Sequence, residues 1–261
     1  MTDDAALASE LAVAAGALLL AVRSEHPDID RGELKDLGDR RAQELLAAGL
    51  ALARPAVCVL SEEAIDDRRR LAARRVWIID PLDGTREFSE GRADWAVHVA
   101  LWESGALVAA AVALPGIDTV LATHPAPLVP SRRGEAGALR MAVSRTRPPA
   151  VAQALTERLG LEPVPMGSAG YKVAAVVRGE VDLYVHAGGQ YEWDSAAPVA
   201  VALAAGLHAS RLDGSPLVYN QDDVLLPDLV VCRPELAARV LAELAQIVRI
   251  EGHDMTSGVS A

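Results

Sequence analysis

The amino-acid sequence predicts a mixed α/β protein from three patterns. Apolar residues recur at helical spacing near the N-terminus, over residues 4–23 and again over 39–53. Two apolar runs, 95–102 and 107–114, are separated by a short Glu-Ser-Gly turn, which is typical of paired antiparallel strands. Beyond residue 138, short β-branched runs alternate with alanine-rich helical segments. We therefore expect an α+β N-terminal half and an α/β C-terminal half.

The N-terminal half is predicted to begin with two helices. Thr2 or Asp3 is the expected N-cap of the first helix. Asp39 is in the position of an N-cap for the second helix, and Pro55 ends it. Strands then follow over residues 56–60, 76–80, 95–102 and 107–114.

The C-terminal half is predicted to alternate between strands and helices. Its strands cover 140–144, 181–185 and 229–232, and its helices cover 148–159, 167–178, 193–206 and 234–248. Residues 115–138 are rich in Pro, Gly and Ser and separate the two halves. This stretch predicts one domain over 1–130 and another over 131–261.

Composition limits the classes of function. The chain has 261 residues, 51% of them hydrophobic, and a formal net charge of −11. No stretch is strongly basic, which argues against a nucleic-acid-binding face. No run approaches the roughly 18 uninterrupted apolar residues of a membrane span, and no secretory leader pattern is present. We therefore expect a cytoplasmic protein that binds neither nucleic acid nor membranes.

The run Trp77–Thr85 carries the strongest signal for chemistry. A short apolar strand leads into two carboxylates three residues apart, Asp80 and Asp83, followed by Gly84 and Thr85. Hard cations such as Mg²⁺ prefer oxygen ligands and often share a bound phosphate with the protein. A glycine beside them lets the backbone approach an anion closely. The run therefore predicts metal-assisted phosphate chemistry.

Three further acidic residues stand at the ends of predicted elements: Glu62 follows a strand, and Asp39 and Asp194 begin helices. Each has an ordinary explanation, because Glu62 can be a solvated strand end and Asp194 can be only an N-cap. Asp80 and Asp83 can likewise form only an Asx turn. Taken together at element ends, these carboxylates predict one shared site.

Two other phosphate-related motifs are excluded. The string DPLDGT separates its aspartates by two residues, which is the wrong spacing for the DxDGT motif of haloacid-dehalogenase-type phosphatases. We therefore predict no aspartyl-phosphate intermediate. The Walker pattern GxxxxGK[ST] is also absent from the sequence.

The chain resembles the inositol monophosphatase superfamily of Mg²⁺-dependent, lithium-sensitive phosphatases. The resemblance rests on Ser61-Glu62-Glu63, Trp77–Thr85 and Trp193–Ala197, which occur in the family's order. It covers most of the chain, from Leu7 to Cys232. It implies a layered α-β-α-β-α sandwich with the metal site between the two halves.

The resemblance also implies the metal ligands. Asp80, Asp83 and Asp194 would hold one Mg²⁺. Glu62, Asp80 and the Leu82 carbonyl would hold a second, and a third, weaker ion is implied near Glu62. Mn²⁺ is implied as a substitute and Li⁺ as an inhibitor. Two such ions can stabilise in-line attack of water on a phosphate without a covalent intermediate.

The catalytic residues implied by the resemblance are Asp39, Thr85 and Glu62. Thr85, linked to Asp39, would orient and deprotonate the attacking water. Family members often have a threonine three residues before the aspartate that Asp39 matches, whereas this chain has Asp36 there. Two alternatives are therefore open: Asp36 is the substitute, or neither aspartate takes part.

Within the superfamily, the C-terminal half resembles the CysQ-type branch, which removes the 3′-phosphate of 3′-phosphoadenosine 5′-phosphate. This part of the resemblance rests on Gly167–Lys172, Glu192-Trp193-Asp194 and Leu212–Asn220, and Ser144-Arg145 also fits it. Lys172 and Arg145 would bind the remaining phosphate, although an exposed helix lysine is the ordinary alternative for Lys172. The implied substrate contacts are Leu82, Asp83, Gly84, Thr85, Ser144, Arg145, Ser168, Lys172 and Asp194.

The expected reaction is therefore hydrolysis of this nucleotide in sulfur assimilation, with 3′-phosphoadenosine 5′-phosphosulfate as a second substrate that the resemblance allows. One alternative is an inositol-1-phosphate or fructose-1,6-bisphosphate phosphatase that uses the same metals. An alternative of another class is a non-catalytic nucleotide-binding regulator, which the presence of all four metal carboxylates argues against. The expected partner is a small phosphorylated nucleotide or sugar, and the resemblance allows a homodimer.

Overall fold

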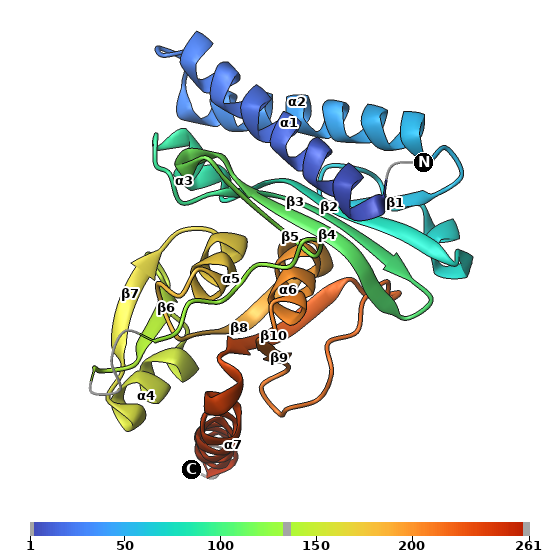
Figure 1. The fold of residues 1–261 in the computed structure, drawn as a ribbon. Coiled ribbons are helices and arrows are strands. Elements are labelled where there is room, and N and C mark those ends of the chain that lie inside the picture. The colour runs from blue at the N-terminus through green and yellow to red at the C-terminus, as the bar shows by residue number, and fades with distance from the viewer. Residues whose placement is uncertain (1–2, 133–136, 258–261) are drawn as a thin grey trace.

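The computed structural model describes residues 3–132 and 137–257, which fold into five layers (Figure 1). Two helices cover one face of a first β-sheet, and two more helices separate that sheet from a second one. A third pair of helices covers the outer face of the second sheet. The predicted layered α-β-α-β-α sandwich is therefore confirmed.

The first sheet has the strand order β1-β2-β3-β4-β5. Its strands are β1 (Cys58–Ser61), β2 (Arg75–Asp83), β3 (Ala96–Glu103), β4 (Ala106–Leu114) and β5 (Thr119–Ala122). β1 runs parallel to β2, and the other neighbours are antiparallel. The predicted antiparallel pair is confirmed as β3 and β4, joined through Ser104 and Gly105, both with positive φ.

The second sheet has the order β7-β6-β8-β10-β9. Its strands are β6 (Arg140–Ser144), β7 (Glu162–Met166), β8 (Leu183–Tyr191), β9 (His208–Ser210) and β10 (Leu225–Cys232). β6 is parallel to both β7 and β8, whereas β10 is antiparallel to β8 and β9. The prediction for 140–144 agrees with the bounds of β6.

The helices occupy three layers. The outer layer on the first sheet is α1 (Asp4–Glu25) and α2 (Arg31–Ala53), the central layer is α5 (Ala169–Val177) and α6 (Glu192–Ala204), and the outer layer on the second sheet is α4 (Ala150–Leu159) and α7 (Pro234–Ser257). The part of the chain that the structure describes also has three short helices, namely α3 (Thr85–Ser89) and the 3₁₀ helices η1 (Arg68–Ala72) and η2 (Pro115–Ile117).

Strand β2 shows how the sequence fixes the layers. Successive side chains on a strand point to opposite faces of the sheet. Trp77 and Ile79 pack against α1 and α2, whereas Val76 and Ile78 pack against the central helices. All four side chains are buried, which explains why this strand reads as one continuous apolar run.

The second helix begins earlier than the sequence pattern indicates. α2 starts at Arg31 and is capped by Asp30, whose carboxylate accepts a hydrogen bond from Gly32 N at 2.7 Å. Asp39 lies inside the helix, so its predicted role as an N-cap is wrong. The buried face already begins at Leu34, but charged residues surround it in the sequence and hide the helical spacing.

Three short strands, β5, β7 and β9, are not predicted by the sequence. β7 contains Pro163 and Pro165, which argue against an interior strand. It lies at the edge of its sheet. An edge strand has a neighbour on one side only, so the N–H group that each proline lacks is not needed on the open side. β5 and β9 are also edge strands and are only four and three residues long.

Within the described residues, α1 alone is long and apolar enough to cross a membrane, with a mean hydropathy of 2.1. It lies against α2 and the first sheet, and 44% of this span is buried inside the protein. A core helix of a globular protein meets the same test.

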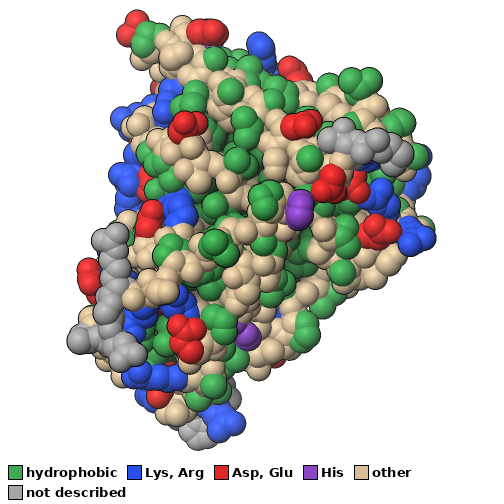
Figure 2. Space-filling model, in the orientation of Figure 1, with side chains coloured by type: hydrophobic (Ala, Val, Ile, Leu, Met, Phe, Trp, Pro, Cys, Tyr) green, Lys and Arg blue, Asp and Glu red, His purple; other side chains and the backbone are tan. Residues whose placement is uncertain are grey.

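On the face shown in Figure 2, basic and acidic side chains are interspersed. The expected lack of membrane and nucleic-acid binding, the cytoplasmic location and the domain division at residue 130 all stay predictions.

Candidate active site

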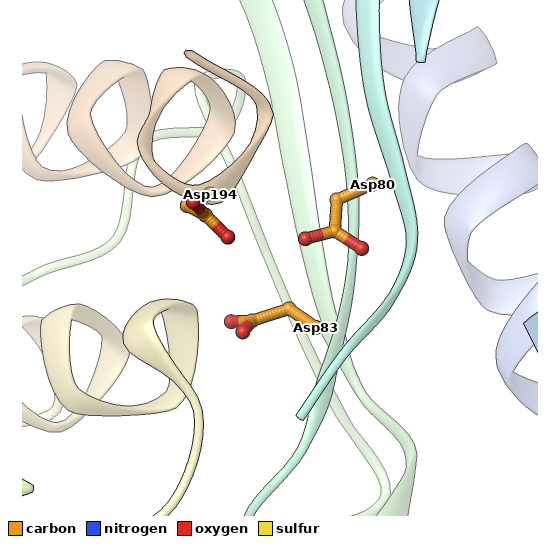
Figure 3. A group of neighbouring side chains, drawn as sticks. All are labelled: Asp80, Asp83 and Asp194. Atoms are coloured by element: carbon orange, nitrogen blue, oxygen red, sulfur yellow. The ribbon is translucent and has the colours of Figure 1, made fainter. Parts of the chain in front are cut away.

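Asp80 and Asp83 lie at the end of β2, where a β-bulge alters the alternation of side chains. Residues three apart on a regular strand point to opposite faces. Here Asp80 pairs with His98 and Asp83 with Ala96, so β2 has one residue more than its partner β3. Gly84 follows with a φ of 92°, and α3 begins at the next residue. The bulge therefore turns both carboxylates to the same side (Figure 3).

Asp194 comes from the first turn of α6, opposite the end of β2. Tyr191 is the N-cap of this helix, so the interpretation of Asp194 as an N-cap is wrong, but Asp194 Oδ2 accepts a hydrogen bond from Tyr191 N at 2.6 Å and so helps to cap the helix. One oxygen from each of Asp80, Asp83 and Asp194 nevertheless lies within 4.8 Å of the other two. Figure 3 shows these three side chains pointing toward one another, and we call them the acidic cluster.

Asp80 is the least compensated member of the acidic cluster. Its side chain is 1% exposed, and its Oδ1 accepts a hydrogen bond from Leu82 N at 3.0 Å. Its Oδ2 has no hydrogen-bond partner among the described residues. Burial, together with the neighbouring negative charges, raises the pKa of Asp80 well above its usual value. A buried carboxylate of this kind needs either a proton or a cation.

Asp83 is stabilised in its charged form by the first turn of α5. Its Oδ1 accepts a hydrogen bond from Ala169 N at 3.2 Å, and its Oδ2 accepts one from Gly170 N at 2.6 Å. Burial opposes ionisation, but the contact with His98 and the bond from Gly170 outweigh it, so the pKa of Asp83 lies below its usual value. Asp83 therefore keeps a negative charge beside Asp80.

His98 belongs to the site, although the sequence analysis gives it no role. Its ring is fully buried, with Nδ1 3.1 Å from the Trp193 carbonyl and Nε2 3.3 Å from Asp83 Oδ2. A Cβ at Gly170 would lie 1.9 Å from Nε2, so only glycine leaves room for this ring. The available signal was one imidazole within the apolar run 95–102.

Glu62 reaches the site because β1 is parallel to β2. Ser61 pairs with Ile79, which places Glu62 next to Asp80 at the same end of the sheet. Although Glu62 is exposed at the surface, the surrounding protein and the charge of Asp194 raise its pKa to about 7. Its carboxylate is not one of the three that meet within 4.8 Å.

Asp39 faces the same acidic region from α2. Partial burial and the charges of Glu63 and Glu62 raise the pKa of Asp39 to about 7. Asp36, one turn earlier, is exposed and also raises the pKa of Asp39 through its charge. Asp39 is therefore close enough to Glu62 and Glu63 for their charges to change its pKa.

Thr85 and Asp39 are not hydrogen-bonded to each other in the described structure. The Thr85 hydroxyl instead donates to the Leu82 carbonyl at 3.3 Å. The predicted direct link between Thr85 and Asp39 is therefore not found among the described residues. The catalytic role of each residue stays a prediction. Leu82 O, the expected backbone ligand, is held in place by this hydroxyl.

A cavity of about 560 Å³ opens beside Asp194. Residues that line it include Ser144, Arg147, Lys172, Tyr184, His186 and Asp194. Lys172 is only 5% exposed, so the alternative of a solvated helix lysine is wrong. Its ammonium donates to the carbonyls of Gly167 and of Ser168, the latter at 2.8 Å. Burial lowers the pKa of Lys172 to about 8.

Arg145 lies outside this cavity. Its guanidinium pairs with Glu87 at 2.9 Å and with Glu90 at 2.7 Å, and it lines a neighbouring cavity of about 330 Å³. Arg147 lines both cavities, and no ion pair involves it within the described residues. Ser144 also lines both, and Ser168 lines the smaller one while it caps α5.

The chain is similar to known proteins of one family. Residues 1–249 match the inositol monophosphatase family. A Mycobacterium leprae protein named 3′-phosphoadenosine 5′-phosphate phosphatase is 53% identical, with 94% of each chain covered. Its Mycobacterium tuberculosis counterpart of the same name is 54% identical, over 90% of this chain and 91% of that protein.

A solved structure agrees with the fold. The crystal structure of CysQ from Bacteroides thetaiotaomicron, described as a bacterial member of the inositol monophosphatase family, superposes with a TM-score of 0.76. It is 26% identical in sequence and covers 88% of this chain and 96% of its own. The similarity therefore extends over most of the fold.

Proposed function

This chain belongs to the inositol monophosphatase family, and we propose that it is a metal-dependent phosphomonoesterase that removes the 3′-phosphate of 3′-phosphoadenosine 5′-phosphate. The observation that carries the proposal is the acidic cluster, in which Asp80, Asp83 and Asp194 bring carboxylate oxygens within 4.8 Å of one another. The substrate is inferred from the names of relatives that are more than half identical. Its place would be in sulfur assimilation.

The acidic cluster fits divalent cations. Asp80 Oδ2 is buried without a hydrogen-bond partner, and the neighbouring carboxylates repel its charge. Oxygen ligands of this type suit Mg²⁺, with Mn²⁺ as a substitute. Asp80, Asp83 and Asp194 would hold one ion, and Glu62 with Asp80 and the Leu82 carbonyl would hold another. When bound, such ions stabilise the charge that develops in an in-line phosphoryl displacement and lower the pKa of water.

The proton of the attacking water needs an acceptor. Asp39 and Glu62 each have a pKa near 7, which suits a group that exchanges a proton at neutral pH. Thr85 can orient the water through its hydroxyl, which already holds the Leu82 carbonyl at 3.3 Å. Asp39 therefore remains the preferred base, acting through water instead of a direct bond to Thr85.

The phosphate to be removed would lie against the backbone that follows β2. Gly84 has a positive φ, and a Cβ there would lie 2.8 Å from the Ser168 Cβ. A side chain at this position would therefore disturb the contact between the two halves. The N–H groups of Gly84 and Thr85 are left to donate to phosphate oxygens.

The second phosphate would enter the 560 Å³ cavity beside Asp194. Lys172 contributes a buried positive charge there, and Arg147 contributes one without a competing carboxylate. Arg145 is already neutralised by Glu87 and Glu90. We therefore favour Arg147 over Arg145 as the arginine that binds substrate.

The test is a panel of phosphate esters, with phosphate release measured with and without Mg²⁺. We expect kcat/KM for 3′-phosphoadenosine 5′-phosphate to exceed that for inositol 1-phosphate and fructose 1,6-bisphosphate, and Li⁺ to inhibit in competition with Mg²⁺. A preference for inositol 1-phosphate would favour the alternative phosphatase. Tight nucleotide binding without phosphate release would favour the non-catalytic regulator.

A further inference from the structure

A second buried polar cluster begins at η1 in the first half of the chain. Arg70 is fully buried, and its Nε and Nη2 donate to the two oxygens of Asp66 at 2.7 and 2.9 Å. Its remaining Nη1 donates to Asn220 Oδ1 at 2.8 Å. All three nitrogens of the guanidinium therefore have acceptors, although Arg70 and Asn220 are 150 residues apart.

Asn220 continues the cluster toward α6. Its side-chain amide donates back to the Arg70 carbonyl at 3.2 Å, and its backbone N–H donates to Glu192 Oε2 at 2.6 Å. Gln221 N donates to the other Glu192 oxygen at 2.7 Å. Glu192 is 1% exposed, and we call Asp66, Arg70, Glu192, Asn220 and Gln221 the Arg70 network.

The Arg70 network connects two segments that carry expected metal ligands. Asp66 lies four residues after Glu62, in the segment between β1 and η1. Glu192 lies two residues before Asp194, in the same first turn of α6. The ladder between β1 and β2 ends at Ser61, one residue before Glu62, and Glu62 itself is exposed. The network therefore links the Glu62 segment to the start of α6, and a pair between Arg68 and Asp222 adds a second link from η1 to the same loop.

The composition of the network indicates a positioning role. A buried ion pair is weak evidence for stability, because apolar residues of the same volume often stabilise as well or better. Ionic and amide groups instead fix one geometry, since each bond has a required direction. Groups that orient metal ligands commonly change metal affinity by about 10–100-fold when removed.

We propose that the Arg70 network positions the Glu62 segment against α6 and thereby sets the affinity of the site for its second divalent ion. This inference rests on the proposed function, because it takes Glu62 as a ligand of that ion. The first ion should depend less on the network, because β2 holds Asp80 and Asp83 and the Tyr191 N–H holds Asp194 independently of Arg70.

Asn220→Gly is the sharpest variant. Asn220 has a φ of 60°, which glycine adopts freely, so the backbone bonds to Glu192 can persist while the contact with Arg70 is lost. Mn²⁺ binding is measured by electron paramagnetic resonance titration, and Mg²⁺ half-saturation by phosphate release. We take the second ion, which uses Glu62, as the weaker of the two Mn²⁺ sites. We expect the affinity of this site and the Mg²⁺ half-saturation to shift about tenfold, with the tighter site unchanged.

Two variants serve as controls. Asn220→Asp keeps the acceptor for Arg70 and should restore metal affinity to within about twofold of the wild type. Arg233→Met breaks another buried ion pair, with Asp182 at 3.1 Å in the second sheet, and should lower stability without moving metal affinity. A shift of equal size in Arg233→Met would show a general stability effect and overturn the proposal.

Glu192→Gln gives an independent reading if Asn220→Gly does not fold. It removes one of the two acceptors for the Asn220 and Gln221 N–H groups, so the weaker Mn²⁺ site should again lose affinity. Unchanged Mn²⁺ binding in whichever variant folds would overturn the positioning role. A wild-type protein that binds no Mn²⁺ would instead contradict the proposed function itself.

Discussion

Two buried polar clusters flank the first turn of α6, and they differ in how their charges are balanced. In the acidic cluster, Asp80, Asp83 and Asp194 bring like charges together, and one Asp80 oxygen has no partner. In the Arg70 network, Arg70 is paired with Asp66, and the carboxylate oxygens accept hydrogen bonds. The acidic cluster contains no Lys or Arg side chain, whereas Arg70 supplies a positive charge within the Arg70 network.

This difference separates binding chemistry from positioning. Like charges that are crowded away from water cost stability unless a proton or cation compensates them. A cluster whose groups satisfy one another has no comparable need for a ligand. We therefore expect substitutions in the acidic cluster to abolish activity at little cost in stability. Substitutions in the Arg70 network should instead weaken binding of the second ion and, where they leave a buried partner unpaired, lower stability, but they should not abolish activity at saturating Mg²⁺.

The largest effect is expected for Asp83→Asn. Removal of a direct ligand should reduce turnover more than about a thousandfold, because loss of outer-shell partners alone is worth about 10–100-fold. Phosphate release at saturating Mg²⁺ measures turnover, and circular dichroism verifies the fold. Asp182→Asn, at another buried aspartate, is the matched control and should retain activity. Activity in Asp83→Asn within tenfold of the wild type would remove its assignment as a ligand.

The second effect concerns stability in the metal-free protein. Arg70→Met leaves Asp66 and Asn220 without their donor and should cost about 3 kcal/mol, measured by urea unfolding. Asp80→Asn removes a poorly compensated charge and should leave the midpoint unchanged or raise it. Loss of stability in both variants, to a similar extent, would erase the distinction between the two clusters.

A smaller effect distinguishes the two arginines after β6. Arg147→Ala should raise KM for the bisphosphate nucleotide about tenfold, as expected when one charge-assisted contact is lost, and should change KM for inositol 1-phosphate little. Arg145→Ala should leave both KM values within about twofold, because Glu87 and Glu90 already neutralise that guanidinium. The reverse ranking would restore Arg145 as the substrate contact.

The acidic cluster could be predicted from sequence because its chemistry is concentrated in short strings. The β-bulge lies between Asp80 and Asp83. Gly84, which follows it, adopts the positive φ at the start of α3. Glu62 follows a strand that is parallel to β2, which brings it beside Asp80, whereas its role as a ligand was implied by the family resemblance and not by the pairing of strands. In this region the local sequence is therefore enough to predict that Asp80 and Asp83 belong to one site.

The cationic side of the site could not be read in this way. Arg145 and Arg147 are two residues apart, and only the distant carboxylates Glu87 and Glu90 decide which one is neutralised. The bond between Arg70 and Asn220 likewise spans 150 residues and follows no periodic pattern. Contacts of this kind depend on how two halves pack, which neither spacing nor composition encodes.

The smallest expected effect is a pH dependence to which the acidic groups around the metal site contribute most, although burial also raises the pKa of Glu192 in the Arg70 network. Asp39 and Glu62 have pKa values of about 7 in the folded protein and Asp194 of about 6, all above their values of about 4 in an unfolded chain. The folded state therefore binds more protons between pH 4 and 7, and stability falls as pH rises through this window.

Thermal unfolding of the metal-free protein at pH 5 and pH 8 measures this slope. The midpoint should fall by a few degrees, roughly 3 °C per kcal/mol for a chain of this size, and Mg²⁺ should oppose the fall because it replaces the lost protons. Glu62→Gln should show a shallower slope, whereas Arg233→Met should keep the wild-type slope at a lower midpoint. A midpoint that rises from pH 5 to pH 8 without metal would mean that protein groups already compensate these carboxylates, as Arg70 compensates Asp66.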